Sequence, residues 1–232
     1  MKKIAVLLFA VIVLTGCANQ KFKPEYRNQI HTVKILAVSW KPREMTYMGR
    51  EQAWGAALGA GVGAGVGMAA GASSLGKAAL GGAGFAAGMK AGDLASMSTV
   101  DAILYNMDTA DINLGALVKK SFEEQLAATG RFKIVGQDEQ ADAQIELTIL
   151  NWGFSLTQGF SSVVYPTIAV SGVMKRGQEL IWQRNEPITP FNGANSYGYT
   201  PLRYRTEPET LRTALTGIAQ IVGSYLVKDL NE

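Results

Sequence analysis

The segment from Ala53 to Ala72 restricts the possible fold of this 232-residue chain more than any other part of it. Its twenty residues are eight alanines, seven glycines and five larger apolar side chains, and none is charged. Glycine recurs at every fourth position, which on a helix places the glycines in one stripe. These glycines are Gly55, Gly59, Gly63, Gly67 and Gly71. Because glycine costs about 1 kcal/mol in a helix interior, such a helix needs close neighbours.

A second glycine- and alanine-rich stretch follows Ser73 and Ser74. Its glycines at the same spacing are Gly84, Gly88 and Gly92. Together the two stretches predict a helical hairpin over residues 51–97, and small side chains on several of its faces favour assembly of several copies. Only residues 78–89 of the second arm are uncharged, fewer than the roughly 20 that cross a bilayer. A flexible Gly/Ala-rich loop or a buried soluble hairpin is the alternative interpretation.

The start of the chain has the pattern of an export signal. The basic residues Lys2 and Lys3 precede an eleven-residue apolar run from Ile4 to Leu14, which is too short for a spanning helix. The run ends in Leu14-Thr15-Gly16-Cys17, and Cys17 is the only cysteine. An ordinary signal peptide with an incidental cysteine is the alternative.

Leu-Thr-Gly-Cys resembles the lipobox of bacterial lipoproteins. The resemblance implies that Cys17 becomes the acylated first residue of the mature chain, carrying palmitate or a similar fatty acid. Ala18 at the next position is associated in that family with delivery to the outer membrane.

The polar residues offer little for chemistry. Without the signal, 20 basic side chains face 19 acidic ones, so no basic field predicts nucleic-acid binding. The single histidine, His31, is expected to be solvated, and no metal site or cofactor is expected. Glu123-Glu124 and Asp138-Glu139 are predicted on a helix face and in a loop, which indicates that the protein is not an enzyme.

The rest of the chain predicts an α+β fold. Alternating patterns predict strands at Thr32–Trp40, Arg131–Val135, Gln144–Trp152, Val163–Met174 and Glu179–Arg184. Pro42 is expected to end the first strand. Asp111 is predicted to cap a helix running to Thr129, and Thr206-Glu207-Pro208-Glu209 is interpreted as the capping box of a second. We therefore expect a small sheet of about four to five strands packed with two helices and interrupted by the Gly/Ala-rich hairpin.

Three features of this layout suggest a family resemblance. A long helix leads at once into Gly130-Arg131-Phe132-Lys133-Ile134-Val135, Ala141-Asp142-Ala143 leads into a strand, and a hairpin ends in Leu180-Ile181-Trp182. The layout resembles the periplasmic domains of CsgG-like envelope lipoproteins. With the glycine-rich hairpin added, it resembles the TraT-type surface-exclusion and complement-resistance lipoproteins. This resemblance implies a lipidated ring anchored by helical hairpins.

The loop from Phe191 to Arg205 is the most site-like stretch outside the hairpin, because tyrosine and arginine are enriched at recognition hot spots. Its candidate partner-binding residues are Tyr197, Tyr199, Arg203, Tyr204 and Arg205. An ordered connector without a partner is the simpler alternative.

Together these patterns predict a non-enzymatic outer-membrane lipoprotein that forms homo-oligomers through its hairpin, as a surface-exclusion-like barrier or as a secretion or pore component. The alternative is a monomeric periplasmic accessory or binding module that docks its hairpin on an envelope protein. The expected parts are a signal peptide (1–16), a lipidated tether (17–31), an α/β domain (32–50 and 98–232) and the hairpin (51–97).

Overall fold

Six strands form one mixed sheet in the computed structural model, which describes residues 19–49, 97–157 and 162–232. The strands are β1 (Thr32–Ile35), β2 (Met45–Met48), β3 (Lys133–Ile134), β4 (Ala143–Ser155), β5 (Tyr165–Arg176) and β6 (Glu179–Ile188). Their order is β3-β1-β4-β5-β6, and β2 pairs with β4 beyond β1. β1 pairs in parallel with β3 and β4, and β2 pairs in parallel with β4, whereas β4, β5 and β6 are antiparallel.

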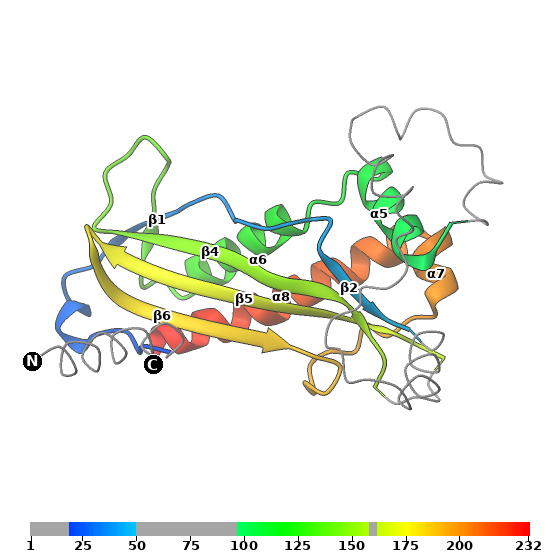
Figure 1. Cartoon of the computed structure of the whole chain (residues 1–232). Helices are drawn as coiled ribbons and strands as arrows, with labels where there is room; N and C mark the ends of the chain where they lie inside the picture. Colours follow the sequence, from blue (N-terminus) through cyan, green and yellow to red (C-terminus); the bar gives the residue numbers. More distant parts are fainter. Residues whose placement is uncertain (1–18, 50–96, 158–161) are drawn as a thin grey trace, which may run out of the picture.

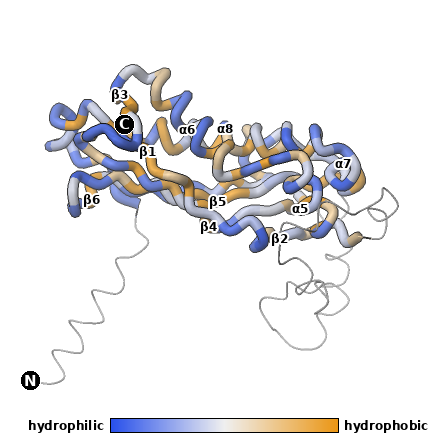
Figure 2. Tube along the Cα trace, turned by 90° about the horizontal axis from the view of Figure 1, so that it is seen from above, coloured by the Kyte–Doolittle hydropathy of each residue, from blue (hydrophilic) through white to orange (hydrophobic). Residues whose placement is uncertain are grey.

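The helices form a second layer on one face of the sheet (Figures 1 and 2). They are α5 (Thr99–Thr109), α6 (Leu114–Ala128), α7 (Pro201–Thr206) and α8 (Pro208–Asn231), and a short 3₁₀ turn, η2 (Pro24–Tyr26), precedes β1. The long helix α8 packs on β5, β6 and α6, and α5 packs on α7. The predicted α+β class is thus confirmed, and the described residues form six strands and four helices where about four to five strands and two helices were expected.

Strand β5 shows why the sheet has one covered face. Its burial alternates with a period of two, so that Ile168, Val170 and Met174 point into the core beneath α8. The residues between them are half-buried on the open face. A turn at Gly177, with a φ of 60°, joins β5 to β6 near the predicted position. The alternation seen in the sequence therefore defines which face carries the helices.

The first strand, β1, ends at Ile35, five residues before the predicted end at Trp40. The chain bends after Ile35, touches β4 again at a bridge between Ser39 and Thr148, and rejoins it as β2 after Pro42. Gly153 of β4 allows this second contact, because a Cβ there would lie 1.8 Å from the carbonyl oxygen of Thr46. The predicted strand Thr32–Trp40 is therefore too long, and β2, which pairs with β4 after Pro42, was not predicted.

Both predicted helix caps also require correction. The cap of α6 is Asn113, whose side chain accepts a hydrogen bond from Ala116 N, whereas Asp111 lies before the helix with a φ of +51°. The predicted capping box at residues 206–209 does not form. Thr206 ends α7, and α8 starts at Pro208 with Glu207 as its cap residue. Helix α7 lies within the stretch that we predicted to be a loop.

Residues 19–31 belong to the folded domain. Phe22 and Ile30 are each 1% exposed, so the domain starts well before residue 32, where we placed its boundary. Residues 19–31 are called the strap below. They begin beside the outer edge of β6, where Gln20 and Gln183 exchange two backbone hydrogen bonds of 2.7 and 2.9 Å, and end at β3, where Lys133 N donates to His31 O at 2.8 Å. His31 is exposed, as predicted.

Candidate functional site

The described chain stops at Gly49, after β2, and resumes at Met97, before α5. β2, α5 and α7 lie at the same end of the domain, and the strap and the end of α8 lie at the other (Figure 1). We call the former the root end, because the Gly/Ala-rich segment joins the domain there in sequence. The latter is called the strap end. The predicted partner loop lies at the root end.

Tyr204 of α7 is the centre of the root end. Its side chain is 0% exposed and its ring contacts those of Phe154 and Tyr199, with centroids 4.6 and 5.8 Å away. The hydroxyl lies 2.7 Å from the carbonyl oxygen of Tyr197 and 3.3 Å from that of Val164. Burial raises the pKa of the Tyr204 hydroxyl far above its usual range. Tyr204 is therefore a neutral core residue, and its proposal as a partner contact was wrong.

Arg205 connects α7 to the point where the described chain resumes. Its guanidinium donates a 3.0 Å hydrogen bond to the carbonyl oxygen of Met97. The same turn is held from α5 by Asn106, which is 3% exposed and whose amide donates to the carbonyl oxygens of Tyr204 and Arg205 at 3.0 and 2.7 Å. The neighbouring Ser98 caps α5 by accepting from Asp101 N. These contacts fix one root of the Gly/Ala-rich segment.

Aromatic rings lie directly on glycines at this end. A Cβ at Gly217 of α8 would come within 2.1 Å of the Tyr197 ring, and one at Gly49 within 2.5 Å of the Tyr47 ring. Tyr47 is only 7% exposed, so the chain leaving β2 passes beneath a buried ring. The absence of a Cβ thus allows close packing next to the other root.

Arg203 and Glu207 form a small polar cluster between α7 and α8. The Nε of Arg203 donates to Glu207 at 2.8 Å, and its guanidinium lies 4.8 Å from the centre of the Tyr199 ring. The Thr210 hydroxyl donates to the same carboxylate at 2.6 Å. The Thr210 and Arg203 hydrogen bonds lower the pKa of Glu207. Arg203 and Tyr199 therefore already have partners within the chain.

The side chains of the predicted partner loop pack against the domain itself, and different side chains at the root end are exposed to solvent. Each of its five candidate residues contacts the rest of the domain, and Asn195 is buried among them. Three large apolar side chains at this end are instead exposed: Met48 (62%), Phe191 (76%) and Leu202 (64%). Sequence reasoning missed them because they follow no periodic pattern.

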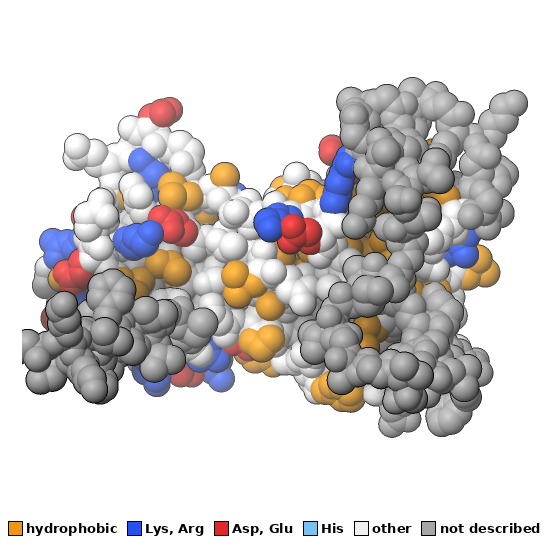
Figure 3. All heavy atoms as spheres, viewed as in Figure 1, with side chains coloured by type: hydrophobic (Ala, Val, Ile, Leu, Met, Phe, Trp, Pro, Cys, Tyr) orange, Lys and Arg blue, Asp and Glu red, His pale blue; other side chains and the backbone are white. Residues whose placement is uncertain are grey.

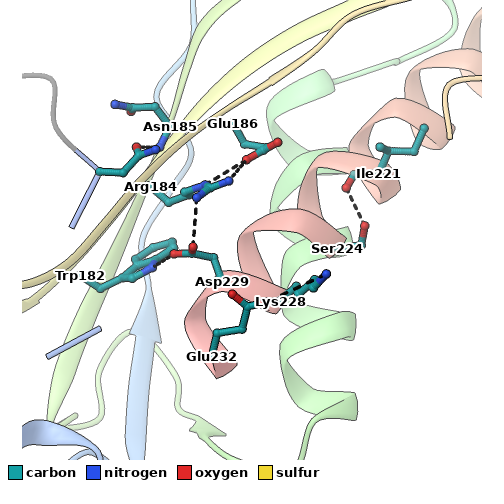
Figure 4. A network of polar contacts seen from close by, with 10 residues as sticks. Trp182, Arg184, Asn185, Glu186, Ile221, Ser224, Lys228, Asp229 and Glu232 are labelled. Atoms are coloured by element: carbon teal, nitrogen blue, oxygen red, sulfur yellow. Dashed lines mark hydrogen bonds and ion pairs between the residues drawn. The ribbon is translucent and has the colours of Figure 1, made fainter. Parts of the chain in front are cut away.

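A second polar cluster joins β6 to α8 (Figure 4). Arg184 donates to Glu186 at 2.9 Å and to Asp229 at 3.1 Å, and the indole nitrogen of Trp182 donates to Asp229 at 2.9 Å. Both carboxylates are close to 10% exposed. Since each has a charged partner, the cluster holds the helix on the strand and leaves no carboxylate for acid–base chemistry. Nothing in the alternation of β6 indicated that Arg184 and Glu186 face the covered side.

A shallow hollow lies along α8. Its volume is about 290 Å³, and it is lined by Tyr197, Arg212, Thr213, Thr216, Gly217 and Gln220. Arg212 donates to the carbonyl oxygen of Ala110 and lies 3.6 Å from Glu209. In the described part of the chain, no three His, Cys, Asp or Glu side chains gather as metal ligands.

Charge and apolar surface are unevenly spread. On the face shown in Figure 3, more charged side chains lie toward the strap end, and apolar ones appear in the middle and near the root end. Among the helices that the structure describes, none combines the length and apolar character needed to cross a bilayer. The predicted lipidation site, Cys17, and the helix-packing glycines from Gly55 to Gly92 lie outside the described residues.

Comparison with known proteins adds little to this picture. No family model matches the chain, and no curated protein matches it. It is similar to protein XCC0632 from Xanthomonas campestris, described with the family model DUF330, at 13% identity and a TM-score of 0.35, over 49% of this chain and 58% of that one. It is also similar to the hypothetical protein CT253 from Chlamydia trachomatis, at 10% identity and a TM-score of 0.39, over 87% of this chain and 94% of that one. At these TM-scores the likenesses support no functional conclusion.

Proposed function

We propose that the chain is a non-enzymatic lipoprotein of the outer membrane, which is anchored by an acylated Cys17 and forms homo-oligomers through the hairpin at residues 51–97. In this role it serves as a surface-exclusion-like barrier or as a component of a secretion apparatus or pore. The runner-up is a monomeric accessory module that docks the same hairpin on an envelope protein.

The observation that carries the proposal is the construction of the root end. The two points where the Gly/Ala-rich segment joins the domain are each held by packed or hydrogen-bonded groups, at Gly49 by the Tyr47 ring and at Met97 by Arg205. A domain that holds both ends of its hairpin gives that hairpin a defined position. When hairpins of several copies pack together, the domains then also take defined positions. The small-residue stripes of the segment suit such packing, because backbones can approach closely along them.

The polar clusters support a non-enzymatic role. Arg184 bridges Glu186 and Asp229 between β6 and α8, and Arg203 pairs with Glu207 between α7 and α8. Each cluster stabilises a joint between two elements. A reactive site needs instead a titratable group with a free face and a shifted pKa.

Substitution in the hairpin tests the oligomer. Gly63→Leu or Gly67→Leu places an isobutyl group where a facing backbone is expected, so the particle mass in mild detergent should fall to that of the monomer. Gly63→Ala is the matched control and should keep most of the assembly, because alanine is still small. Circular dichroism should show the α+β domain folded in all three. Leucine variants that assemble like the unmodified chain would remove the ring and leave the accessory module.

The anchor has a separate test. Radioactive fatty acid should label the unmodified chain, and Cys17→Ser should abolish the label and leave the protein soluble or uncleaved. An unlabelled chain would contradict the lipoprotein assignment whatever its oligomeric state.

A further inference from the structure

The open face of the sheet, which lies away from α6 and α8, has an uncharged middle. At its half nearer the strap end, Glu146 of β4 and Lys175 of β5 pair at 2.9 Å. In the next rows toward the root end, the described side chains of β4, β5 and β6 on this face carry no charge. The middle of the face is formed by Thr148, Leu150, Ala169, Ser171, Asn185 and Pro187. Figure 3 shows apolar side chains there. A sheet face in contact with water alone usually carries polar and charged groups.

A β-bulge turns one large apolar side chain out of this middle region. The register of β4 and β5 shifts between Ile149 and Asn151, so Leu150 is the extra residue. Ile149 points into the core, and Leu150 therefore points to the open face, where it is 59% exposed. Its neighbours across the bulge on β5, Ala169 and Ser171, have small side chains. A protruding leucine thus lies beside a low patch of the same face.

One symmetry axis makes this face complementary to itself. A two-fold axis parallel to the strands and midway between β4 and β5 lays β4 of each copy over β5 of the other. Leu150 of each copy then meets Ala169 and Ser171 of the other copy. Glu146 of each copy lies near Lys175 of the other, so the four charges alternate in sign. An uncharged segment could cover the middle of the face but would offer nothing to this ion pair, and a second copy is therefore the better match.

The same axis suits the proposed assembly. It keeps the two root ends on one side, where the two Gly/Ala-rich segments join their domains. The twelve residues of β5 and three strand spacings give a face of about 38 by 14 Å, so two copies bury roughly 1,000 Å² in total. This total is smaller than the roughly 1,600 Å² of a standard interface. The contact is therefore weak between free copies and forms when the hairpins hold two copies together.

We propose that two copies of the chain pack through the open faces of their sheets, about a two-fold axis that runs parallel to β4 and β5. This inference rests on the proposed homo-oligomer, because the hairpins bring the two copies together. The oligomer then contains an even number of chains.

A photoreactive residue in the full-length protein tests the pairing. Benzoylphenylalanine at position 150 of the particle in mild detergent should give, on irradiation, a product of twice the chain mass that is joined to β5 of the second copy. The control is position 202, because Leu202 is similarly exposed, at 64%, but lies on α7 in the helical layer. It should give no product joined to β5. Gly67→Leu should abolish the product at position 150, because the hairpins no longer hold two copies together.

A charge on the open face gives a second measurement. Leu150→Lys places two ammonium groups near the axis, so the particle should dissociate at a protein concentration about tenfold higher. Leu202→Lys is the matched control and should leave that concentration unchanged.

The possible failures are distinguishable. A multimer that gives no crosslink between copies at position 150, or that contains an odd number of chains, would overturn the pairing and leave the proposed function in place. A product joined to residues 51–97 of the same chain, or to a different protein, would do the same. An unmodified particle that is monomeric would instead remove the proposed homo-oligomer itself.

Discussion

At the strap end, the Glu179 carboxylate accepts from Lys23 and Tyr26 while remaining exposed to solvent. At the root end, the Tyr204 hydroxyl lies within 2.7 Å of a carbonyl oxygen inside the core. The first end is held by backbone pairing, two buried apolar side chains and exposed ion pairs, and the second by rings packed on glycines and by buried hydrogen bonds. Exposed ion pairs contribute little each and respond to salt, whereas buried packing responds to volume.

The difference fits the task that the account assigns to the root end. Charged groups that remain solvated are enough to hold the strap on the sheet. The roots of a hairpin that packs against its neighbours need positions fixed more tightly than exposed ion pairs allow. The strap end and the root end should therefore unfold under different conditions, and a substitution can destabilise one end and leave the other folded.

The largest effect should come from Tyr204→Ala. Removing a ring that contacts Phe154 and Tyr199 should lower the free energy of unfolding by about 3–5 kcal/mol. Tyr204→Phe keeps the ring and removes only the donor to Tyr197 O, so it should cost about 1 kcal/mol. Denaturant unfolding gives both values. A cost below 1 kcal/mol for the alanine variant would show that the root end is not built on this ring.

Gly217→Ala should have the next largest effect. Alanine ordinarily favours a helix over glycine, yet here its Cβ would meet the Tyr197 ring at 2.1 Å. We expect a loss of about 1–3 kcal/mol from overpacking. Adding Tyr197→Ala should recover part of it, because the ring is then gone. A Gly217→Ala variant as stable as the unmodified chain would indicate that the ring moves freely.

Both ends should respond to pH, and the strap end also holds Tyr26, whose pKa is raised by its hydrogen bond to Glu179. Hydrogen bonds from His31 N, Thr32 N and the Thr32 hydroxyl lower the pKa of Asp142, and Lys23 and Tyr26 lower that of Glu179. A lowered folded-state pKa stabilises the fold above the unfolded value, near 4 for such groups, and this stability is lost as pH falls through the lower folded value. The strap should therefore loosen in acid, below about pH 4.

The root end should weaken in alkali. Because burial raises the pKa of Tyr204, its stabilising effect is complete below the unfolded value of about 10 and declines as pH rises above it. Glu207, with its lowered pKa, adds a loss in acid at the root end. Hydrogen exchange of the backbone amides of Gln20 and Asn106, measured across pH and corrected for intrinsic rates, would show which end opens first. Joint opening at both extremes would contradict separate control of the ends.

Lys23→Gln should produce the smallest change. It removes one exposed ion pair of 2.6 Å, so the melting temperature should fall by less than about 2 °C. The exchange of the strap amides should nevertheless speed up. Lys119→Gln breaks a comparable exposed pair with Glu123 on α6 and serves as the control, because it should leave the strap unchanged. A strap that exchanges equally in both variants would show that Lys23 does not help to hold it.

Much of the fold could be predicted because it rests on local periodicity. The alternation in β5 is regular over ten or more residues, that in β4 is regular up to Leu150, and the predicted helix to Thr129 corresponds to α6 within a few residues. Helix α5 was missed although Ile103 and Met107 are one helical turn apart and Ser98 caps its start. Strand β2 was missed because Pro42 suggested an end, whereas the pairing is restored by Gly153 on another strand.

The candidate site was harder to predict, because its contacts join residues far apart in the sequence. The bond between Arg205 and Met97, and the packing of Tyr197 on Gly217, depend on how α7 and α8 meet. Composition indicated that tyrosine and arginine in this loop do something specific. It could not indicate that their partners lie within the chain itself.

Native mass spectrometry of the detergent-extracted, unmodified protein tests the central claim most directly. One spectrum reports the mass of each chain and the mass of the particle. The account predicts chains that start at Cys17, carry acyl groups and form one defined multimer. A monomeric particle, or chains without added acyl mass, would contradict it.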